Sequence, residues 1–136
     1  MLRDQLCGVL DDFQRIPGFD YARDWSKVEM DYSGNCHERP RSLRDGEHGV
    51  YAFFQSHKWL RIGQTSHSPR FTSQHYGTNR ARSNFARDIW KNRAEFGYKG
   101  EEQNIGDWIL KTFGRANIIL PSHWPSSVSP FLEAYM

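Results

Sequence analysis

The chain has 136 residues, 38% of them hydrophobic and 15% aromatic, and its formal net charge is +2. This length favours one domain whose modest core depends on aromatic side chains. Two distant cysteines, Cys7 and Cys36, exclude a disulfide framework and no apolar run reaches membrane-spanning length, so we expect a cytoplasmic protein with reduced thiols and no membrane partner.

The first 47 residues are expected to form a helix and an irregular arm. Apolar side chains recur at helical spacing over residues 2–15, and Ile16-Pro17-Gly18 ends that helix. Residues 19–47 are polar and lack a sustained period, so we predict an arm here, with room for a short helix near residues 25–30. This part could supply target recognition or a dimer contact, and its residues favour neither.

Residues 48–136 are predicted to form an α+β domain with a small three-stranded antiparallel sheet flanked by helices. The aromatic run 49–54, a polar turn and residues 59–63 form a β-hairpin, and residues 117–120 provide the third strand. Most of the predicted helices begin at a residue that can cap the helix N-terminus, in some cases followed by Pro in the first turn. These starts lie at Ser68-Pro69, at Ser83 for a helix of about residues 84–95, at Asp107, and at Ser129-Pro130 for a last helix from Phe131 that Met136 truncates.

Positive charge is concentrated in the middle of the chain. Residues 56–94 hold eight Lys or Arg against one acidic residue, whereas both flanking segments are net acidic. Such a stretch in a nearly neutral protein favours a polyanionic partner, and the alternative is a solvated helix face. The candidates for contacts with a nucleic-acid backbone are Lys58, Arg80, Arg82, Arg87 and Lys91.

The segments that can carry chemistry come in a defined order. They are Gly49-Val50-Tyr51, Arg61-Ile62-Gly63, Arg70, Ser83-Asn84-Phe85-Ala86 and Leu132-Glu133. Their order and spacing resemble the GIY-YIG nuclease superfamily over about residues 48–136. The resemblance implies a metal-dependent endonuclease that hydrolyses DNA phosphodiester bonds, with RNA as the alternative polymer.

The resemblance also implies roles for individual side chains. Tyr51 would position the attacking water or accept its proton, and the alternative for this residue is a core aromatic with a satisfied hydroxyl. Arg70, in the first turn of a helix, would bind phosphate oxygens and stabilise the charge that develops on them. Glu133 would hold one Mg²⁺ or Mn²⁺ ion together with substrate phosphate and several waters.

Two positions depart from the family's pattern. Arg61 replaces the second tyrosine, where a cation could bind phosphate and preserve activity, or mark a domain that binds nucleic acid without cutting it. The family often has a histidine four residues after the helix arginine; here that position is Gln74, and His75 follows it. In a regular helix His75 would be turned about 140° from Arg70, near the site but not on its face.

Other classes of function have weaker support. Cys7, Cys36 and His37 lack the number and spacing of zinc ligands, and no Gly-rich phosphate loop ending in Lys-Ser or Lys-Thr occurs. Two alternatives to an active nuclease remain. One is a catalytically inactive nucleic-acid-binding module on the same fold, and the other is a protein-interaction domain whose basic helix is incidental.

Overall fold

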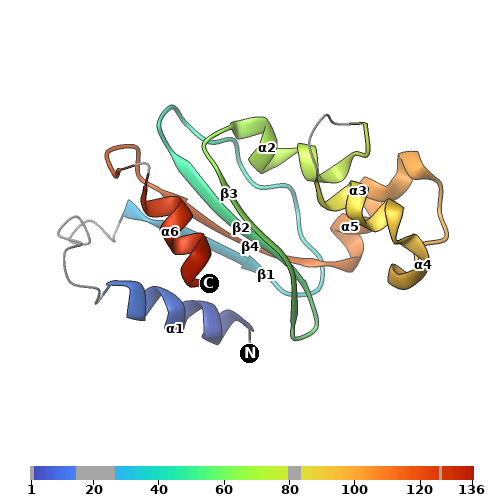
Figure 1. Ribbon diagram of the computed structural model, residues 1–136, viewed down its shortest axis with the longest axis horizontal. Coiled ribbons are helices and arrows are strands. Elements are labelled where there is room, and N and C mark those ends of the chain that lie inside the picture. The colour runs from blue at the N-terminus through green and yellow to red at the C-terminus, as the bar shows by residue number, and fades with distance from the viewer. Residues whose placement is uncertain (1, 15–26, 80–83, 126) are drawn as a thin grey trace.

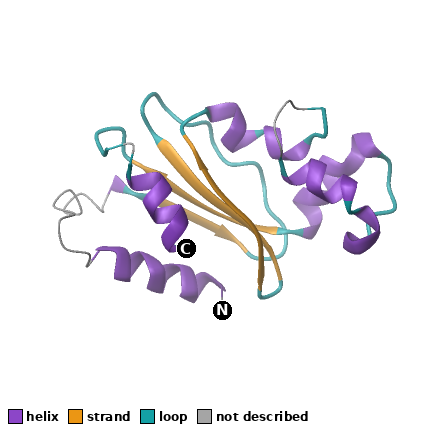
Figure 2. Cartoon of the chain, viewed as in Figure 1, coloured by secondary structure: helices purple, strands orange, loops and turns teal. Residues whose placement is uncertain are grey.

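The computed structural model describes residues 2–14, 27–79, 84–125 and 127–136, and it has one antiparallel sheet with helices on both faces (Figure 1). The strands are β1 (Glu29–Ser33), β2 (His48–Gln55), β3 (Lys58–Thr65) and β4 (Gly114–Leu120), in the order β1-β4-β2-β3. The α-helices, coloured purple in Figure 2, are α1 (Leu2–Gln14), α2 (Ser68–Thr72), α3 (Phe85–Lys91), α4 (Arg93–Phe96), α5 (Ile105–Thr112) and α6 (Val128–Tyr135). Two 3₁₀ turns are η2 (Gln74–Tyr76) and η3 (Glu102–Asn104). The predicted α+β class is confirmed, but the sheet has four strands instead of three.

The additional strand, β1, lies in the segment predicted to be an irregular arm. It pairs antiparallel with β4, so that Asp31 lies opposite Asn117. The prediction of an arm is wrong for residues 29–33, and so is the short helix near residues 25–30 where it overlaps β1. Polar and apolar side chains alternate here as in a strand, but only Met30 and Tyr32 are apolar, and so short a run does not stand out from the polar residues around it. The N-terminal part of the chain therefore contributes directly to the sheet.

The hairpin of β2 and β3 is confirmed. Tyr51 lies opposite Gly63, and the turn between the strands contains Ser56, whose φ of 55° is in the left-handed region. β2 is flanked by β3 and β4, and its residues from Gly49 to Phe54 are buried. Its apolar and aromatic composition follows from this central place.

Helices cover both faces of the sheet. Side chains alternate along β2, so Tyr51 and Phe53 point to one face whereas Val50 and Phe54 point to the other. The first, which we call the α2 face, packs against α2, η2, α3 and α5. The second, the α6 face, packs against α1 and α6, which lie together in Figure 1.

Several helix boundaries differ from the predictions. The helix expected over residues 84–95 breaks at Asn92 into α3 and α4, and the Asn84 side chain caps α3 by accepting a hydrogen bond from the Arg87 N–H at 2.9 Å. The predicted cap, Ser83, lies outside the described residues. The last helix begins at Val128, three residues earlier than expected. None of the described helices combines the length and apolarity needed to cross a bilayer.

Candidate functional site

Tyr51 lies on the α2 face at the central part of β2. Its ring is 2% exposed and packs against the ring of His75, with the centroids 4.6 Å apart. The tyrosine hydroxyl lies directly over Gly63, so a Cβ at that glycine would overlap it. The hydroxyl therefore points along the sheet towards β3, an edge strand.

His75 is fully buried on the α2 face. Its Nδ1 accepts a hydrogen bond from the Phe85 backbone N–H at 3.1 Å, so the neutral ring carries its proton on Nε2. Nε2 has no hydrogen-bond partner within the described part of the chain. Burial, and then the charges of Arg115, Arg70 and Arg61, lower the pKa of His75 to about 2. At neutral pH this side chain is an uncharged N–H donor.

The helical geometry expected for His75 is not the one observed. α2 ends at Thr72 and a 3₁₀ turn, η2, carries His75. The rotation calculated for a regular α-helix therefore does not apply, and His75 lies where the charge of Arg70 reaches it.

Two arginines bring positive charge to the same place. Arg70 Nη1 is buried and, among the described residues, has no hydrogen-bond partner. Arg61, on β3, forms an ion pair with Asp88 of α3. Both charges act on His75. The structure thus brings four predicted residues together, and we call Tyr51, Arg61, Arg70 and His75 the tyrosine site.

Arg115 of β4 adjoins the tyrosine site and was missed by the sequence interpretation. Its side chain is 1% exposed, and its Nε donates to Asn117 Oδ1 at 2.6 Å, its Nη1 to the Tyr76 hydroxyl at 2.8 Å and its Nη2 to the Phe71 carbonyl at 2.6 Å. Its Cζ also lies 5.2 Å from the centroid of the Tyr51 ring. Burial lowers the pKa of this guanidinium, which is held by neutral groups and ring faces. A charged residue inside an apolar strand is the signal that could have identified it.

Tyr76 and His37 extend the network of Arg115. His37 Nδ1 donates to the Phe113 carbonyl at 2.7 Å, because a carbonyl can only accept, so Nε2 accepts from the Tyr76 hydroxyl at 2.7 Å. Tyr76 in turn accepts from Arg115. Burial lowers the pKa of His37 to about 4, in keeping with a neutral imidazole. This directed chain of hydrogen bonds fixes the guanidinium beneath the tyrosine site.

Glu133 lies apart from the tyrosine site. Its neighbour Leu132 packs into the apolar cluster of the α6 face, whereas Tyr51 belongs to the α2 face. One helical turn earlier, Ser129 donates a hydrogen bond to Gln64 Oε1 at 3.1 Å, which places this side of α6 beside β3. Burial raises the pKa of the Glu133 carboxyl.

The described residues contain no group of three or more His, Cys, Asp or Glu side chains that could hold a metal ion. A single carboxylate such as Glu133 fits a Mg²⁺ ion that keeps most of its waters, and fits Zn²⁺ poorly. Any metal that the chain binds through Glu133 would therefore depend on water and substrate for most of its ligands.

No family model, curated protein or solved structure matches this chain. The geometry of the tyrosine site itself indicates the chemistry that the site can support. That geometry combines a phenol with buried N–H donors and positive charge, an arrangement suited to an anionic oxygen.

The predicted backbone-binding residues are only partly placed. Arg87 and Lys91 are exposed and lie one turn apart on α3. Together with Asp88 they line a pocket of about 440 Å³. Because Asp88 pairs with Arg61, this side of α3 adjoins the tyrosine site. Lys58 is exposed at the hairpin end of β3. Arg80 and Arg82 lie outside the described residues.

Proposed function

We propose that the chain is a metal-dependent endonuclease of the GIY-YIG type that hydrolyses DNA, with the tyrosine site as its catalytic centre. The observation that carries the proposal is a pair of buried donors, Arg70 Nη1 and His75 Nε2, that lack hydrogen-bond partners among the described residues. A buried donor without a partner costs about 1–3 kcal/mol. Two of them beside Tyr51 favour a ligand that accepts hydrogen bonds, and a phosphate oxygen also matches the positive charge.

Each side chain of the tyrosine site has a role in this reaction. Arg70 binds the phosphate and stabilises the negative charge that grows on its oxygens as water attacks phosphorus. His75 donates its Nε2 proton in a hydrogen bond to the same group and stays neutral, because its pKa is about 2. Tyr51, held in place over Gly63, orients the attacking water or accepts its proton. Arg61 adds a second cation when substrate displaces Asp88 from it.

Glu133 is the residue proposed to hold one Mg²⁺ or Mn²⁺ ion. When bound, such an ion supplies Lewis-acid stabilisation of charge on the phosphate. Ser129, one turn before Glu133, brings α6 to β3, the edge strand towards which the Tyr51 hydroxyl points from the opposite face, so an ion on Glu133 would act around this edge of the sheet.

The second candidate function is nucleic-acid binding without cleavage. Two observations favour it: the helix of Glu133 covers the opposite face of the sheet from Tyr51, and Arg61 is already paired with Asp88. In this case the two unpartnered donors would still bind a backbone phosphate, and no bond would break.

A plasmid-nicking assay with Mg²⁺ or Mn²⁺ separates the two. Tyr51→Phe and Glu133→Ala should each reduce nicking by about 100-fold or more, since each removes a group assigned to the transition state. Tyr32→Phe is the matched control, because Tyr32 is a partly exposed tyrosine that stacks on Phe54 on the α6 face.

The remaining outcomes decide between the alternatives. If the wild-type protein nicks the plasmid no faster than either variant, the endonuclease function is ruled out. Salt-sensitive binding to a DNA duplex without nicking then supports the binding module, and an RNA duplex tested in parallel identifies the polymer. Absence of any salt-dependent binding leaves a protein-interaction domain.

A further inference from the structure

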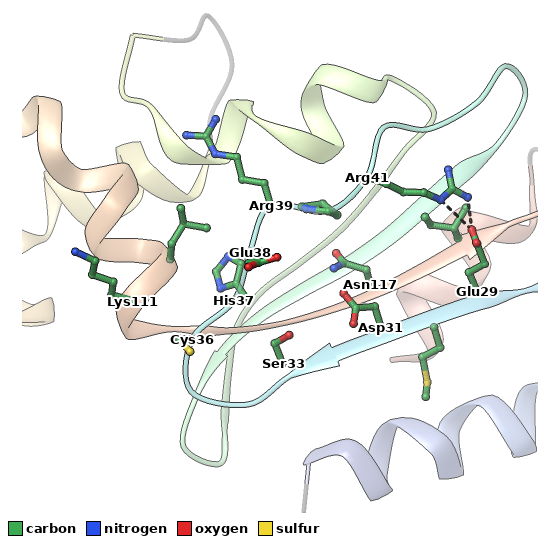
Figure 3. Close-up of a pocket in the computed structure, with 14 residues that line it drawn as sticks. Glu29, Asp31, Ser33, Cys36, His37, Glu38, Arg39, Arg41, Lys111 and Asn117 are labelled. Atoms are coloured by element: carbon green, nitrogen blue, oxygen red, sulfur yellow. Dashed lines mark hydrogen bonds and ion pairs between the residues drawn. The ribbon is translucent and has the colours of Figure 1, made fainter.

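A second cavity lies on the α2 face, at the opposite edge of the sheet from β3. Its volume is about 920 Å³, and it lies between strands β1 and β4 and the segment of residues 36–41 that crosses above them (Figure 3). That volume is within the range of small-molecule sites. The Tyr51 hydroxyl points away from it towards β3, so the cavity is separate from the tyrosine site.

Asn117 forms part of the cavity floor and has a defined orientation. Its side chain accepts a hydrogen bond from Arg115 Nε, a group that can only donate, so the amide oxygen faces the arginine. The amide NH₂ group is thereby left to face the cavity, and within the described residues it donates to no acceptor. Asn117 is 4% exposed, so this donor is built into the protein and is not a mobile surface group.

Asp31 places an acceptor next to that donor. It lies directly opposite Asn117 in the β1–β4 pair, on the same face of the sheet, and Figure 3 shows the two side chains next to each other. The Asp31 carboxylate forms no hydrogen bond or ion pair with other described residues, whereas Glu29 on the same strand is paired with Arg41. The cavity floor thus offers one amide donor beside the two acceptor oxygens of one carboxylate.

The walls suit a flat molecule, and two basic side chains on the rim can meet a negatively charged group on it. Ile119 and Leu110 provide apolar surface along the cavity. Arg39, held over the Tyr76 ring with its Cζ 5.1 Å from the centroid, and Lys111 bring positive charge to the rim. Glu38 lies among these groups, and with Asp31 and the Glu29–Arg41 pair it completes a charged lining that has no net charge.

We propose that this cavity binds the guanine base of a nucleotide. The Watson–Crick edge of guanine presents two neighbouring donors, N1–H and N2–H, followed by the O6 acceptor. Asp31 accepts from both donors while the Asn117 amide donates to O6, and adenine, cytosine and uracil each lack that order of groups. The phosphate of the nucleotide lies towards Arg39 and Lys111. This inference does not rest on the proposed nuclease function, since none of the tyrosine-site residues takes part.

Equilibrium binding to the full chain tests the base preference. GMP should bind at least about tenfold more tightly than AMP, CMP or UMP, because a bidentate contact with the correct base discriminates by this factor or more. IMP, which lacks the N2 amino group, should fall between GMP and AMP. The proposal is overturned if the four mononucleotides bind equally and an unpaired guanine in an oligonucleotide gives no gain in affinity either. It is also overturned if none of these ligands binds.

Replacement of one carboxylate oxygen of Asp31 by an amide nitrogen gives a stricter test of the guanine contact. Asp31→Asn keeps an oxygen that accepts from N1–H but replaces the second acceptor with a donor, which matches the O2 carbonyl of xanthine. The variant should lose about tenfold or more in affinity for GMP and gain affinity for XMP. Asp31 is exposed, so folding should be retained, and Asp45→Asn in a turn outside the cavity is the matched control. Unchanged GMP and XMP affinities in Asp31→Asn contradict the proposal even if GMP binds.

A second set of ligands shows whether the guanine belongs to a free nucleotide or to a nucleic acid. Single-stranded oligonucleotides with one unpaired guanine are compared with the same strands carrying inosine or adenine at that position. Tight binding of GMP itself supports a free nucleotide, and guanine-dependent binding of the oligonucleotide alone supports an unstacked residue of a nucleic acid. In both cases Asp31→Asn must remove the guanine preference.

Discussion

Gly63 lies opposite Tyr51 in the β2–β3 pair, and the absence of a side chain at Gly63 makes room for the tyrosine hydroxyl. This contact is a physical reason for a glycine at position 63 opposite a tyrosine at position 51. A glycine at this edge-strand position lets the phenol lie along the sheet and reach towards β3.

We expect Gly63→Ala to displace Tyr51. The added methyl group would overlap the hydroxyl and the ring carbon that bears it, and such overpacking costs about 1–3 kcal/mol of unfolding free energy. A displacement of about 1 Å at a catalytic group would also lower plasmid nicking by about 100-fold. Gly8→Ala is the matched control, because a Cβ at Gly8 of α1 meets nothing within 4 Å. Gly63→Ala protein with wild-type urea denaturation and wild-type nicking would show that the contact is dispensable.

The sequence allows those parts of the fold to be predicted whose signals are local. The helix of residues 2–14 and the β2–β3 hairpin have strong periodicity or a short turn, and both are confirmed. β1 was missed because its partner β4 lies far along the chain and its outer position leaves it polar. Pairing at long range depends on the whole sheet, which no window of residues contains.

Residues of the two sites could likewise be predicted from the sequence only where they belong to short motifs. Tyr51 and Arg70 belong to short motifs and could be named, whereas Arg115 acquires its importance from partners on η2 and α2. Asp31 and Asn117 become neighbours only through the β1–β4 pairing that the sequence did not reveal. The position of His75 could not be derived either, because α2 ends before it and the regular helical rotation fails.

Stability should fall as the pH drops towards 4, because His37 is buried as a neutral ring. Its pKa is about 4 in the folded chain and near 6.5 when exposed, so between these values the unfolded state binds more protons. The stability contributed by neutral His37 is present above about pH 6.5 and is lost as the pH falls, by about 3 kcal/mol at pH 4.

Urea denaturation of wild type and His37→Asn over this pH range measures the effect. Asn keeps a donor near the position of Nδ1 and does not titrate, so the variant should lose less stability than wild type between pH 7 and pH 4. His57→Asn, at an exposed position of the hairpin turn, should leave the wild-type slope unchanged. Parallel pH profiles for wild type and His37→Asn would contradict the buried neutral ring.

Asp88→Asn should strengthen binding to nucleic acid. Asp88 neutralises Arg61, and the pair is partly exposed, so its loss costs the fold little and removes one negative charge beside Arg61, close to Arg70 and His75. One additional phosphate contact makes the slope of log affinity against log salt steeper by about 0.9 on duplex DNA. The affinity at low salt should rise by roughly 3- to 10-fold.

Fluorescence anisotropy with a labelled DNA duplex over a series of salt concentrations gives both quantities. Glu95→Gln, on the exposed side of α4, makes the same change in net charge away from Arg61 and is the matched control. An equal gain in both variants would mean that net charge alone is responsible, and that Arg61 does not contact the polymer.

Glu133→Gln should separate stability from activity. Burial raises the pKa of this carboxyl, which means that the folded chain disfavours its ionised form. For an acid with a raised pKa, stability is lost as the pH rises through that pKa, so the neutral amide should unfold at a temperature equal to or above that of wild type at neutral pH. The same variant should lose about 100-fold or more of Mg²⁺-dependent nicking, because an amide is a far weaker ligand for Mg²⁺ than a carboxylate. Retained or raised stability with lost nicking is expected of a residue kept for function at a cost to the fold.

Full nicking activity in Glu133→Gln would show that this carboxylate does not bind the metal ion. Glu95→Gln, at an exposed position, is the control and should change neither the stability nor the nicking activity.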